Sequence, residues 1–512
     1  LTGDVDVPTL SAMVRRRRTE NAPASIWDVR SVARALDAAN LRPHGATVVQ
    51  GWLARNPSVT SWDDLPWTTP PLSTIAPRAR DVIVSAFVPR TTRVESAHDS
   101  ADGSTTKLVI RLADGLAVEA VVMRHNTRQS RRVTTCVSSQ IGCQMACSFC
   151  STGTMGLVGD LSEGEILEQF LAARTLEARA SNVVFMGMGE PLNNYDAVLA
   201  ACRSLLDDRV FALGYGRVTV STVGIASKIR RLGVDEPRVS LALSLHAPTQ
   251  SQRVAIMPAA RAHDLDALAA ALDEYTALKV AAGMGRKAKR ADQPLLMIEY
   301  ILLGGVNDRD ADADALADLL SKHAFGARSM VNLIAYNAVP GLPYERPSDE
   351  RVAGFQTRVQ SADVLCCVRK TMGDDVNGAC GQLVKQTQPI EHGSSLSSSS
   401  SSGSGGGGAK KQVDIEDCGF GDSGRRRVAV PPPRRRREAT ASSTSGGTHR
   451  PPADADASSS SSSKPRAARD APRHRSVARP VVALLGGALL SVLAGWWVFL
   501  ASGDSSTGGV RW

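Results

Sequence analysis

Three cysteines stand close together in the chain, Cys143, Cys147 and Cys150, in a CxxxCxxC pattern. They are too close in sequence to belong to separate structural elements, and iron–sulfur clusters are held by cysteine thiolates of this kind. Three ligands with no fourth in the same stretch leave one iron of a four-iron cluster open, where a small molecule can bind and be activated. A structural zinc site would use four ligands, usually as two separated pairs of cysteines. The pattern therefore favours a [4Fe–4S] cluster over zinc, buried thiols or disulfides.

The elements that position these cysteines are predicted from the alternation of short apolar runs with helical patterns between residues 133 and 384. One helix is marked at its start by Ser162 and Glu165, which form a capping-box pattern. Strands that alternate with helices indicate parallel strands joined by right-handed crossovers, hence an α/β barrel or part of one. We predict strands at Val133–Val137, Asn182–Gly187, Arg217–Thr222, Val239–Ser244, Leu295–Leu303, Ser329–Ala335 and Val364–Arg369.

The cysteine stretch is expected to follow the first of these strands. Ligand-binding loops of such barrels lie at the carboxyl ends of the strands, so the cysteines are on the side of the barrel where a site is expected.

The part of the chain before the barrel is predicted to be mostly helical. Residues 26–90 carry short helical patterns at Val29–Ala38 and Thr47–Ala54, separated by prolines, which indicates a small accessory domain. A polar arm over residues 1–25 is expected to precede it. Apolar runs at Lys107–Leu112 and Ala117–Met123, around an Asp-Gly turn, predict a β-hairpin that leads into the core. We place the whole core, with this lead-in, at residues 91–385.

The part of the chain after the core differs in composition. Residues 386–480 are rich in Ser, Gly, Pro and Arg and carry most of the net charge of +9, which predicts a disordered basic linker. Residues 481–503 contain no charged side chain and are long enough for one transmembrane helix, followed by a short tail at residues 504–512. Basic residues before this segment would keep the bulk of the protein on the cytosolic or stromal side. The alternative is that the tail comes from a mispredicted exon.

Several motifs around the cysteines occur together and in a fixed order. This set resembles the dual-specificity adenine-C2 methyltransferases of ribosomal and transfer RNA, which are radical S-adenosylmethionine (SAM) enzymes, and it is most similar to their plant and algal paralogues. The resemblance covers residues 26–385 and implies a partial (β/α)6-type radical SAM barrel. The motifs are Cys136-Val-Ser-Ser-Gln-Ile-Gly-Cys143, Phe185-Met-Gly-Met-Gly-Glu-Pro191, Ser221-Thr-Val-Gly224, Ser244-Leu-His-Ala247 and Gly378-Ala-Cys-Gly-Gln-Leu383, together with the cysteine triplet.

The resemblance implies two groups of ligands. Cys143, Cys147 and Cys150 would hold the cluster. Each SAM-contacting residue, taken alone, has an ordinary structural explanation, but together they come from several separate predicted strand ends, which favours a shared binding face. The SAM contacts implied are Gly189, Glu190, Ser221, Ser244, Leu245, His246 and Asn337.

The resemblance also assigns roles to three residues outside the cluster. The target carbon of adenine is not nucleophilic, so simple displacement on SAM cannot methylate it. Cys380 would take a methyl group from one SAM to become S-methylcysteine, and a second SAM would supply a 5′-deoxyadenosyl radical that abstracts hydrogen from this methyl group. Cys136 would then attack the Cys380 sulfur to release the RNA, leaving a disulfide for a reductant to reset. Glu119 matches the proton acceptor, although an exposed strand Glu is common and needs no such role.

The target base must leave its stack for this chemistry, and single-stranded RNA presents such bases. Two basic groups, and the helical accessory domain, are candidates for contacting the RNA backbone, with a solvated surface as the alternative for both groups. One group is Arg124, Arg128, Arg131 and Arg132, and the other lies in the segment Gly283–Asp292.

We therefore predict a SAM-dependent RNA methyltransferase that forms 2-methyladenosine in large-subunit rRNA, with tRNA as a second candidate substrate. Its partners would include a flavodoxin- or ferredoxin-like electron donor, and we expect a monomer in a reducing compartment, the cytoplasm or plastid stroma, with a tether to a membrane. One rival is an adenine-C8 methyltransferase that uses the same cysteines. The other is a non-catalytic metal-cluster protein that binds RNA, in which Cys136 and Cys380 would have no chemical role.

Overall fold

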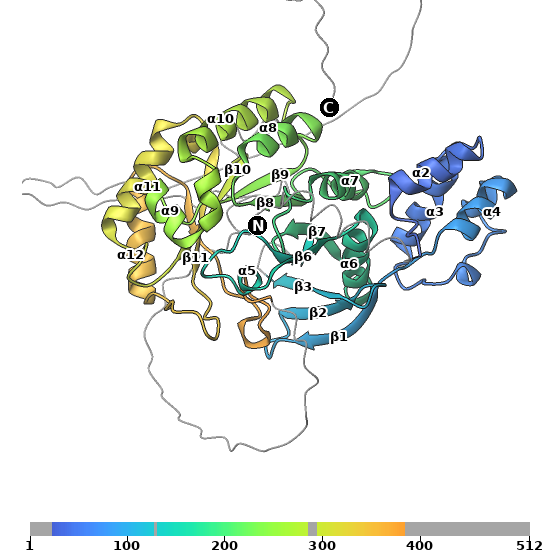
Figure 1. Ribbon diagram of the computed structural model, residues 1–512, viewed down its shortest axis with the longest axis horizontal. Coiled ribbons are helices and arrows are strands. Elements are labelled where there is room, and N and C mark those ends of the chain that lie inside the picture. Colours follow the sequence, from blue (N-terminus) through green and yellow to red (C-terminus); the bar gives the residue numbers. More distant parts are fainter. Residues whose placement is uncertain (1–22, 127–130, 285–293, 384–512) are drawn as a thin grey trace, which may run out of the picture. The chain divides into compact units, whose positions relative to one another are not determined.

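The computed structural model describes residues 23–126, 131–284 and 294–383 (Figure 1). All of them belong to one compact unit. The predicted arm up to residue 22, most of the basic segment Gly283–Asp292, the linker and the apolar segment at 481–503 lie outside the described residues. Within the described ranges, no helix is both long and apolar enough to cross a membrane.

One mixed sheet forms the centre of the described structure, with the strand order β1-β2-β3-β4-β7-β8-β9-β10-β11-β12. Neighbours from β1 to β4 pair antiparallel, and neighbours from β4 to β12 pair parallel. The strands are β1 Arg93–Asp99, β2 Thr105–Arg111, β3 Ala117–Asn126, β4 Arg131–Cys136, β7 Ala180–Phe185, β8 Val218–Thr222, β9 Ser240–Ser244, β10 Leu296–Leu302, β11 Ser329–Ala335 and β12 Cys366–Val368.

Helices connect the parallel strands, as the alternating pattern predicts, and α8, α10, α11 and α12 follow the outside of the sheet (Figure 1). Ser162 caps α6 through the predicted capping box, because its hydroxyl accepts the Glu165 N–H and the Glu165 carboxylate accepts its N–H. The helices of this part are α6 Glu163–Leu176, α7 Tyr195–Leu206, α8 Ala226–Asp235, α9 Gln250–Ile256, α10 Leu265–Ala281, α11 Asp310–Lys322 and α12 Asp349–Gln360.

The predicted part of an α/β barrel is confirmed, and all seven predicted strands form. The parallel part has seven strands, one more than a (β/α)6 barrel, because β12 adds to β11. The cysteine stretch follows β4 as predicted, but a two-stranded hairpin that was not predicted, β5 Gln140–Cys143 and β6 Gly156–Asp160, lies on either side of it. Strands this short, with a glycine inside β5, lack the apolar alternation by which strands are recognised in a sequence.

The N-terminal helices α2 Val29–Ala38, α3 His44–Arg55 and α4 Pro77–Ala86 form the predicted accessory domain, and it is docked onto α6. Buried Glu168 of α6 accepts hydrogen bonds from the Ser25 hydroxyl at 2.7 Å and the Thr92 N–H at 2.7 Å. Trp27 is 1% exposed and packs on Phe211, with 5.3 Å between ring centroids. Burying the Glu168 carboxylate without these donors would cost free energy. The interface is therefore favoured only in the docking geometry that brings the donors to it.

A second carboxylate of this interface predicts a pH dependence of stability. Glu163 accepts hydrogen bonds from the Val29 N–H and the Ser204 hydroxyl, and burial, together with the charge of Asp28, raises its pKa to about 8. An unfolded glutamate titrates near 4.5, so between these values the folded state binds more protons than the unfolded state. The free energy of unfolding should therefore fall as pH rises from 4.5 to 8, by up to about 1.4 kcal/mol per pH unit from this group.

The measurement is urea denaturation at several pH values in this window. Glu163→Gln should flatten the slope, whereas Glu274→Gln, which removes the same charge from an exposed ion pair with Arg230, should leave it unchanged. Equal slopes for Glu163→Gln and wild type would contradict the assignment.

Candidate active site

The three cysteines of the CxxxCxxC pattern gather at one place, at the end of the β5–β6 hairpin. Cys143 is the last residue of β5, and Cys150 immediately precedes the short helix α5 Ser151–Thr154. Burial raises the pKa of all three thiols, and the charges of Cys143 and Cys150 raise that of Cys147 further. The thiols are therefore close enough to share one site, and binding an iron–sulfur cluster there would release their protons.

The cysteine loop is anchored on the barrel by residues between its ligands. The Ser148 N–H donates to the Ile256 carbonyl at 3.0 Å, and its hydroxyl lies 2.6 Å from the Tyr344 hydroxyl. Phe149 packs edge-on against the His246 ring, with centroids 5.1 Å apart. The loop thus rests on residues that follow β9 and β11, where the resemblance implies SAM contacts.

Glu190 is buried beside the cysteines. Its carboxylate accepts the Leu192 N–H at 3.0 Å and the Val223 N–H at 2.9 Å, and its charge raises the pKa of Cys143 and Cys147. Burial raises the pKa of Glu190 itself to about 7. The preceding Gly189 has φ +102°, and a Cβ there would lie 2.6 Å from the Gln140 side chain, so a glycine is needed for this close approach.

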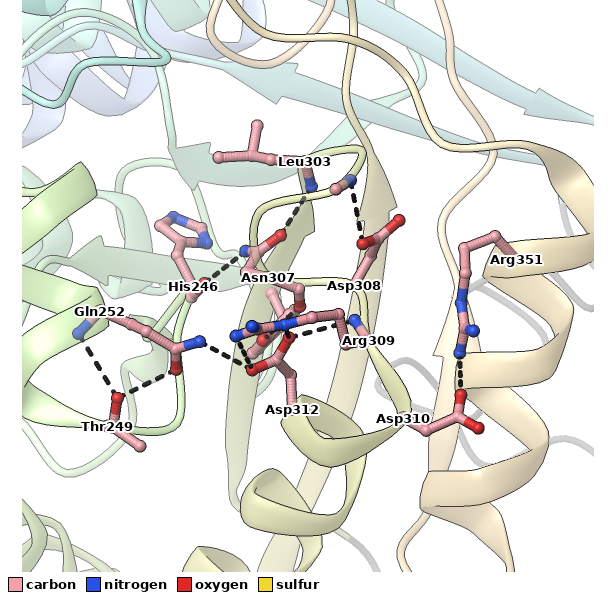
Figure 2. Close-up of polar contacts among 12 residues, drawn as sticks. His246, Thr249, Gln252, Leu303, Asn307, Asp308, Arg309, Asp310, Asp312 and Arg351 are labelled. Atoms are coloured by element: carbon pink, nitrogen blue, oxygen red, sulfur yellow. Dashed lines mark hydrogen bonds and ion pairs between the residues drawn. The ribbon is translucent and has the colours of Figure 1, made fainter.

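His246 is held as a neutral ring. Its Nδ1 accepts the Ile301 N–H at 3.1 Å, so in the neutral ring the proton is on Nε2. Burial, helped by the charge of Arg253, lowers its pKa to about 3, so the ring stays neutral at physiological pH. Figure 2 shows how its backbone is fixed: the Asn307 amide donates to the His246 carbonyl at 2.7 Å. His246 therefore offers a fixed Nε2–H donor at the end of β9.

The other residues implied as SAM contacts also lie at strand ends. Ser221 of β8 and Ser244 of β9 have their hydroxyls 3.3 Å apart, and Leu245 follows in a buried position. Asn337, which follows β11, accepts a hydrogen bond from the Thr371 hydroxyl at 3.1 Å. These positions agree with a binding face along the carboxyl ends of the parallel strands.

Cys380 lies in a loop that is hydrogen-bonded onto the cysteine loop, although more than two hundred residues separate them. The Ser151 N–H donates to the Gly381 carbonyl at 2.8 Å, and the Thr152 hydroxyl donates to the Leu383 carbonyl at 2.7 Å. The Asn337 amide also lies 3.4 Å from the Cys380 carbonyl. The loop is thereby connected to both the cysteine triplet and a predicted SAM contact.

Cys136 and Cys380 line the same cavity on the inner face of the sheet, which encloses about 1040 Å³ including its opening. Both are free thiols. Burial and, to a smaller extent, the charge of Cys380 raise the pKa of Cys136 to about 12, and the charge of Arg369 opposes this rise. The two thiols are therefore close enough to interact electrostatically, and both face one shared cavity.

Glu119 and the basic candidates are placed differently from this group. Glu119 is 2% exposed, so it is not an ordinary exposed strand residue; it forms a 3.4 Å ion pair with Lys107 and is not among the residues that line the cavity. Arg124 pairs with Glu177, whereas Arg132 lines the cavity itself. Arg131 is exposed, and Arg128 lies outside the described residues.

Several residues of the site carry no signal in the sequence. Arg369 lines the cavity beside Cys136, with its guanidinium 3.9 Å from the Glu299 carboxylate. Burial raises the pKa of Glu299, and the Asn332 amide donates to it at 2.8 Å. Arg253 is fully buried near Cys147. In a sequence, a buried arginine or glutamate cannot be told from one on the surface, because the order of residue types does not show which side chains are buried.

The donor set fits a four-iron cluster. Three thiols with raised pKa values share one site, and a buried guanidinium lies beside them to offset negative charge. Within the described part of the chain, no three His, Cys, Asp or Glu side chains converge on one metal ion. A cluster places its ligands on different irons, so its thiolates need not converge on one point.

Comparisons with known proteins point the same way. A family model described as "Radical SAM superfamily" matches residues 137–317. The "Dual-specificity RNA methyltransferase RlmN" of Nitratidesulfovibrio vulgaris (strain DP4) is 42% identical over 298 residues, which are 57% of this chain and 77% of that relative. The protein of the same name from an Anaeromyxobacter species is 38% identical over 365 residues, 70% of this chain and 89% of that relative. Among solved structures, a radical SAM methyltransferase from Sphaerobacter thermophilus is 33% identical, with a TM-score of 0.60, and the match covers 70% of this chain and 99% of that one.

Proposed function

Because the chain belongs to the RlmN family of radical SAM RNA methyltransferases, which bind a [4Fe–4S] cluster and SAM, we propose that it forms 2-methyladenosine in large-subunit rRNA and in tRNA. The observation that carries the proposal is the pair of free thiols, Cys136 and Cys380, on one cavity beside the cysteine triplet. A protein that only bound RNA would have no use for this pair.

The cluster and SAM are held by the groups described above. Cys143, Cys147 and Cys150 ligate the cluster, and the seven strand-end residues from Gly189 to Asn337 contact SAM. When bound, the two together supply a 5′-deoxyadenosyl radical through one-electron cleavage of SAM. Glu190 can accept from an ammonium group in addition to its two backbone donors, because a carboxylate has about four acceptor positions. His246 can donate from Nε2.

Cys380 acts as the methyl carrier. It takes a methyl group from one SAM, and once a hydrogen atom is removed from that group, its carbon bonds to adenine C2. Loss of the C2 proton to a base, and of one electron to a one-electron acceptor such as an oxidised iron–sulfur cluster, then restores the aromatic ring. Enzyme and RNA are then joined through a carbon–sulfur bond. The resemblance assigns the proton to Glu119, which pairs with Lys107 and does not itself line the cavity.

Cys136 releases the product. Attack of its thiolate on the Cys380 sulfur forms an S–S bond and breaks the S–C bond, whose electron pair, with a proton, completes the new methyl group. A two-electron reductant then returns both cysteines to thiols. Arg369 supports this step, because its charge lowers the pKa of Cys136 against the effect of burial.

The test is nucleoside mass spectrometry of rRNA and tRNA from cells that lack the gene. The two methyladenosine isomers have equal mass, so they must be separated by chromatography against standards. We expect loss of 2-methyladenosine, restored by the wild-type gene. Loss of 8-methyladenosine instead would establish the adenine-C8 rival, and unchanged levels of both would establish a protein without this activity.

We also propose a reducing compartment for the protein, the cytoplasm or plastid stroma. The chemistry above uses Cys136 and Cys380 as thiols at the start of each turnover, and in an oxidising compartment a pair that can form a disulfide would accumulate in that form.

A further inference from the structure

Arg253 is a fully buried arginine beside the cysteine loop, and the proposed mechanism gives it no role. It belongs to α9, and its side chain is 0% exposed. A guanidinium has five N–H donors and keeps its charge at neutral pH, so its burial is costly unless those donors and that charge are compensated.

Two of its three nitrogens are engaged by the ends of neighbouring strands. Nε donates to the Leu245 carbonyl at 3.1 Å, and Nη2 donates to the Val223 carbonyl at 2.7 Å. These carbonyls follow β9 and β8, next to the predicted SAM contacts. Arg253 therefore holds two strand ends of the binding face in a fixed relation.

The third nitrogen, Nη1, is buried and has no hydrogen-bond partner. Unsatisfied buried donors are rare in folded proteins, and a functional role at a bound group is one explanation for them. Here the ligand has a clear place, because the cysteine loop is attached to the same helix: the Ser148 N–H donates to the Ile256 carbonyl at the end of α9. Burial lowers the pKa of Arg253 to about 10, and the charge of Cys147 opposes this change. The guanidinium that carries this donor is therefore near enough to a cluster ligand to interact with its charge.

We propose that Arg253 is a positioning residue for the cluster, in which Nη1 donates a hydrogen bond to the Cys147 sulfur and raises the reduction potential of the cluster. The inference rests on the proposed function only in taking Cys147 as a cluster ligand. A positive charge and an N–H donor at a ligand sulfur stabilise the reduced cluster, which carries one more negative charge. This matters because the cluster must accept an electron before SAM is cleaved.

The same donor would also suit the carboxylate of SAM, and the experiment separates the two acceptors. Holoenzyme reconstituted anaerobically is titrated with reductant and followed by electron paramagnetic resonance, first without SAM. In Arg253→Met, we expect the ratio of reduced to oxidised cluster at a given potential to fall about tenfold, which is about 59 mV for a one-electron couple. Arg253→Lys, which keeps the charge, should show a smaller fall. The matched control is Arg261→Met, which removes an exposed arginine from the short helix Pro258–Ala262 that follows α9, and it should show no change in potential.

An unchanged potential in Arg253→Met with full iron content would overturn the proposal. So would a variant in which only the affinity for SAM falls, since the donor would then serve the carboxylate. If Arg253→Met does not hold iron, the test is made on wild-type enzyme labelled with ¹⁵N-arginine. Electron spin echo spectra of its reduced cluster should show a ¹⁵N coupling. The same coupling should be absent in labelled Arg253→Lys. Failure of the proposed function would appear elsewhere, as unchanged 2-methyladenosine in cells, and would leave these spectra as they are.

Discussion

Cys136→Ala should accumulate a covalent adduct between the enzyme and its RNA. The methyl group would be carried to the base from Cys380, and without a second thiol the carbon–sulfur bond that joins them has no partner to break it. Turnover should fall by at least about a thousandfold, the size usual for loss of a nucleophile. The adduct is measured by incubating enzyme, SAM, reductant and RNA anaerobically, then digesting the RNA and finding the nucleotide mass on the peptide that contains Cys380.

Three variants give this result its meaning. Cys380→Ala should form neither adduct nor product, because the methyl carrier is gone. Cys136→Ala combined with Cys380→Ala should behave as Cys380→Ala does, since release cannot matter before attachment. Cys202→Ala removes a thiol that is 0% exposed in α7, away from the cavity, and should turn over and release RNA as wild type does. No adduct in Cys136→Ala, with SAM cleavage intact, would contradict the resolving role.

The barrel could be predicted from the sequence because its strands are recorded in local patterns. The run Leu295–Leu303 became β10 Leu296–Leu302, all of whose side chains are buried, as expected for a parallel strand covered on both faces. Ser162 and Glu165 marked the start of α6 because a capping box depends only on residues three apart. Patterns that involve only neighbouring residues can be recognised without knowing how the rest of the chain folds.

The parts of the site that depend on distant contacts could not be predicted in this way. The Ser151 N–H and the Thr152 hydroxyl donate to carbonyls of the Cys380 loop, and nothing local in the sequence marks these two groups for that contact. Arg253 carries no mark that distinguishes a buried arginine from a solvated one. Glu119 had an ordinary exposed position as its alternative, yet it is buried and paired with Lys107, because β2 and β3 bring the two onto one face. Burial and long-range pairing are decided by the whole fold.

Gly142→Ala should prevent the cysteine loop from holding its cluster. Gly142 has φ +73° at a register shift in the β5–β6 hairpin, and a Cβ there would lie 1.9 Å from the Gly156 carbonyl oxygen. Both groups are backbone of paired strands, so neither can move without opening the hairpin. Cys143 is the next residue and pairs with Gly156, so its sulfur would be displaced from the other two. Backbone strain persists only where the surrounding structure enforces it, so we expect the hairpin to relieve the clash by opening. Bound iron should then fall below about half of wild type, and SAM cleavage should fall with it.

Gly156→Ala is the matched control in the opposite strand. Gly156 has φ +66°, but a Cβ there would meet no atom within 4 Å. It therefore incurs only the backbone cost of a left-handed residue, about 1–2 kcal/mol, and should keep its iron while melting at a lower temperature. Iron and acid-labile sulfide per chain, measured after anaerobic reconstitution, compare the two variants. If both lose iron equally, left-handed strain alone weakens the hairpin; if Gly142→Ala keeps its cluster, the hairpin does not set the position of Cys143. If only Gly142→Ala loses its iron, the close approach of the two strands is what holds Cys143, the first cluster ligand, in place.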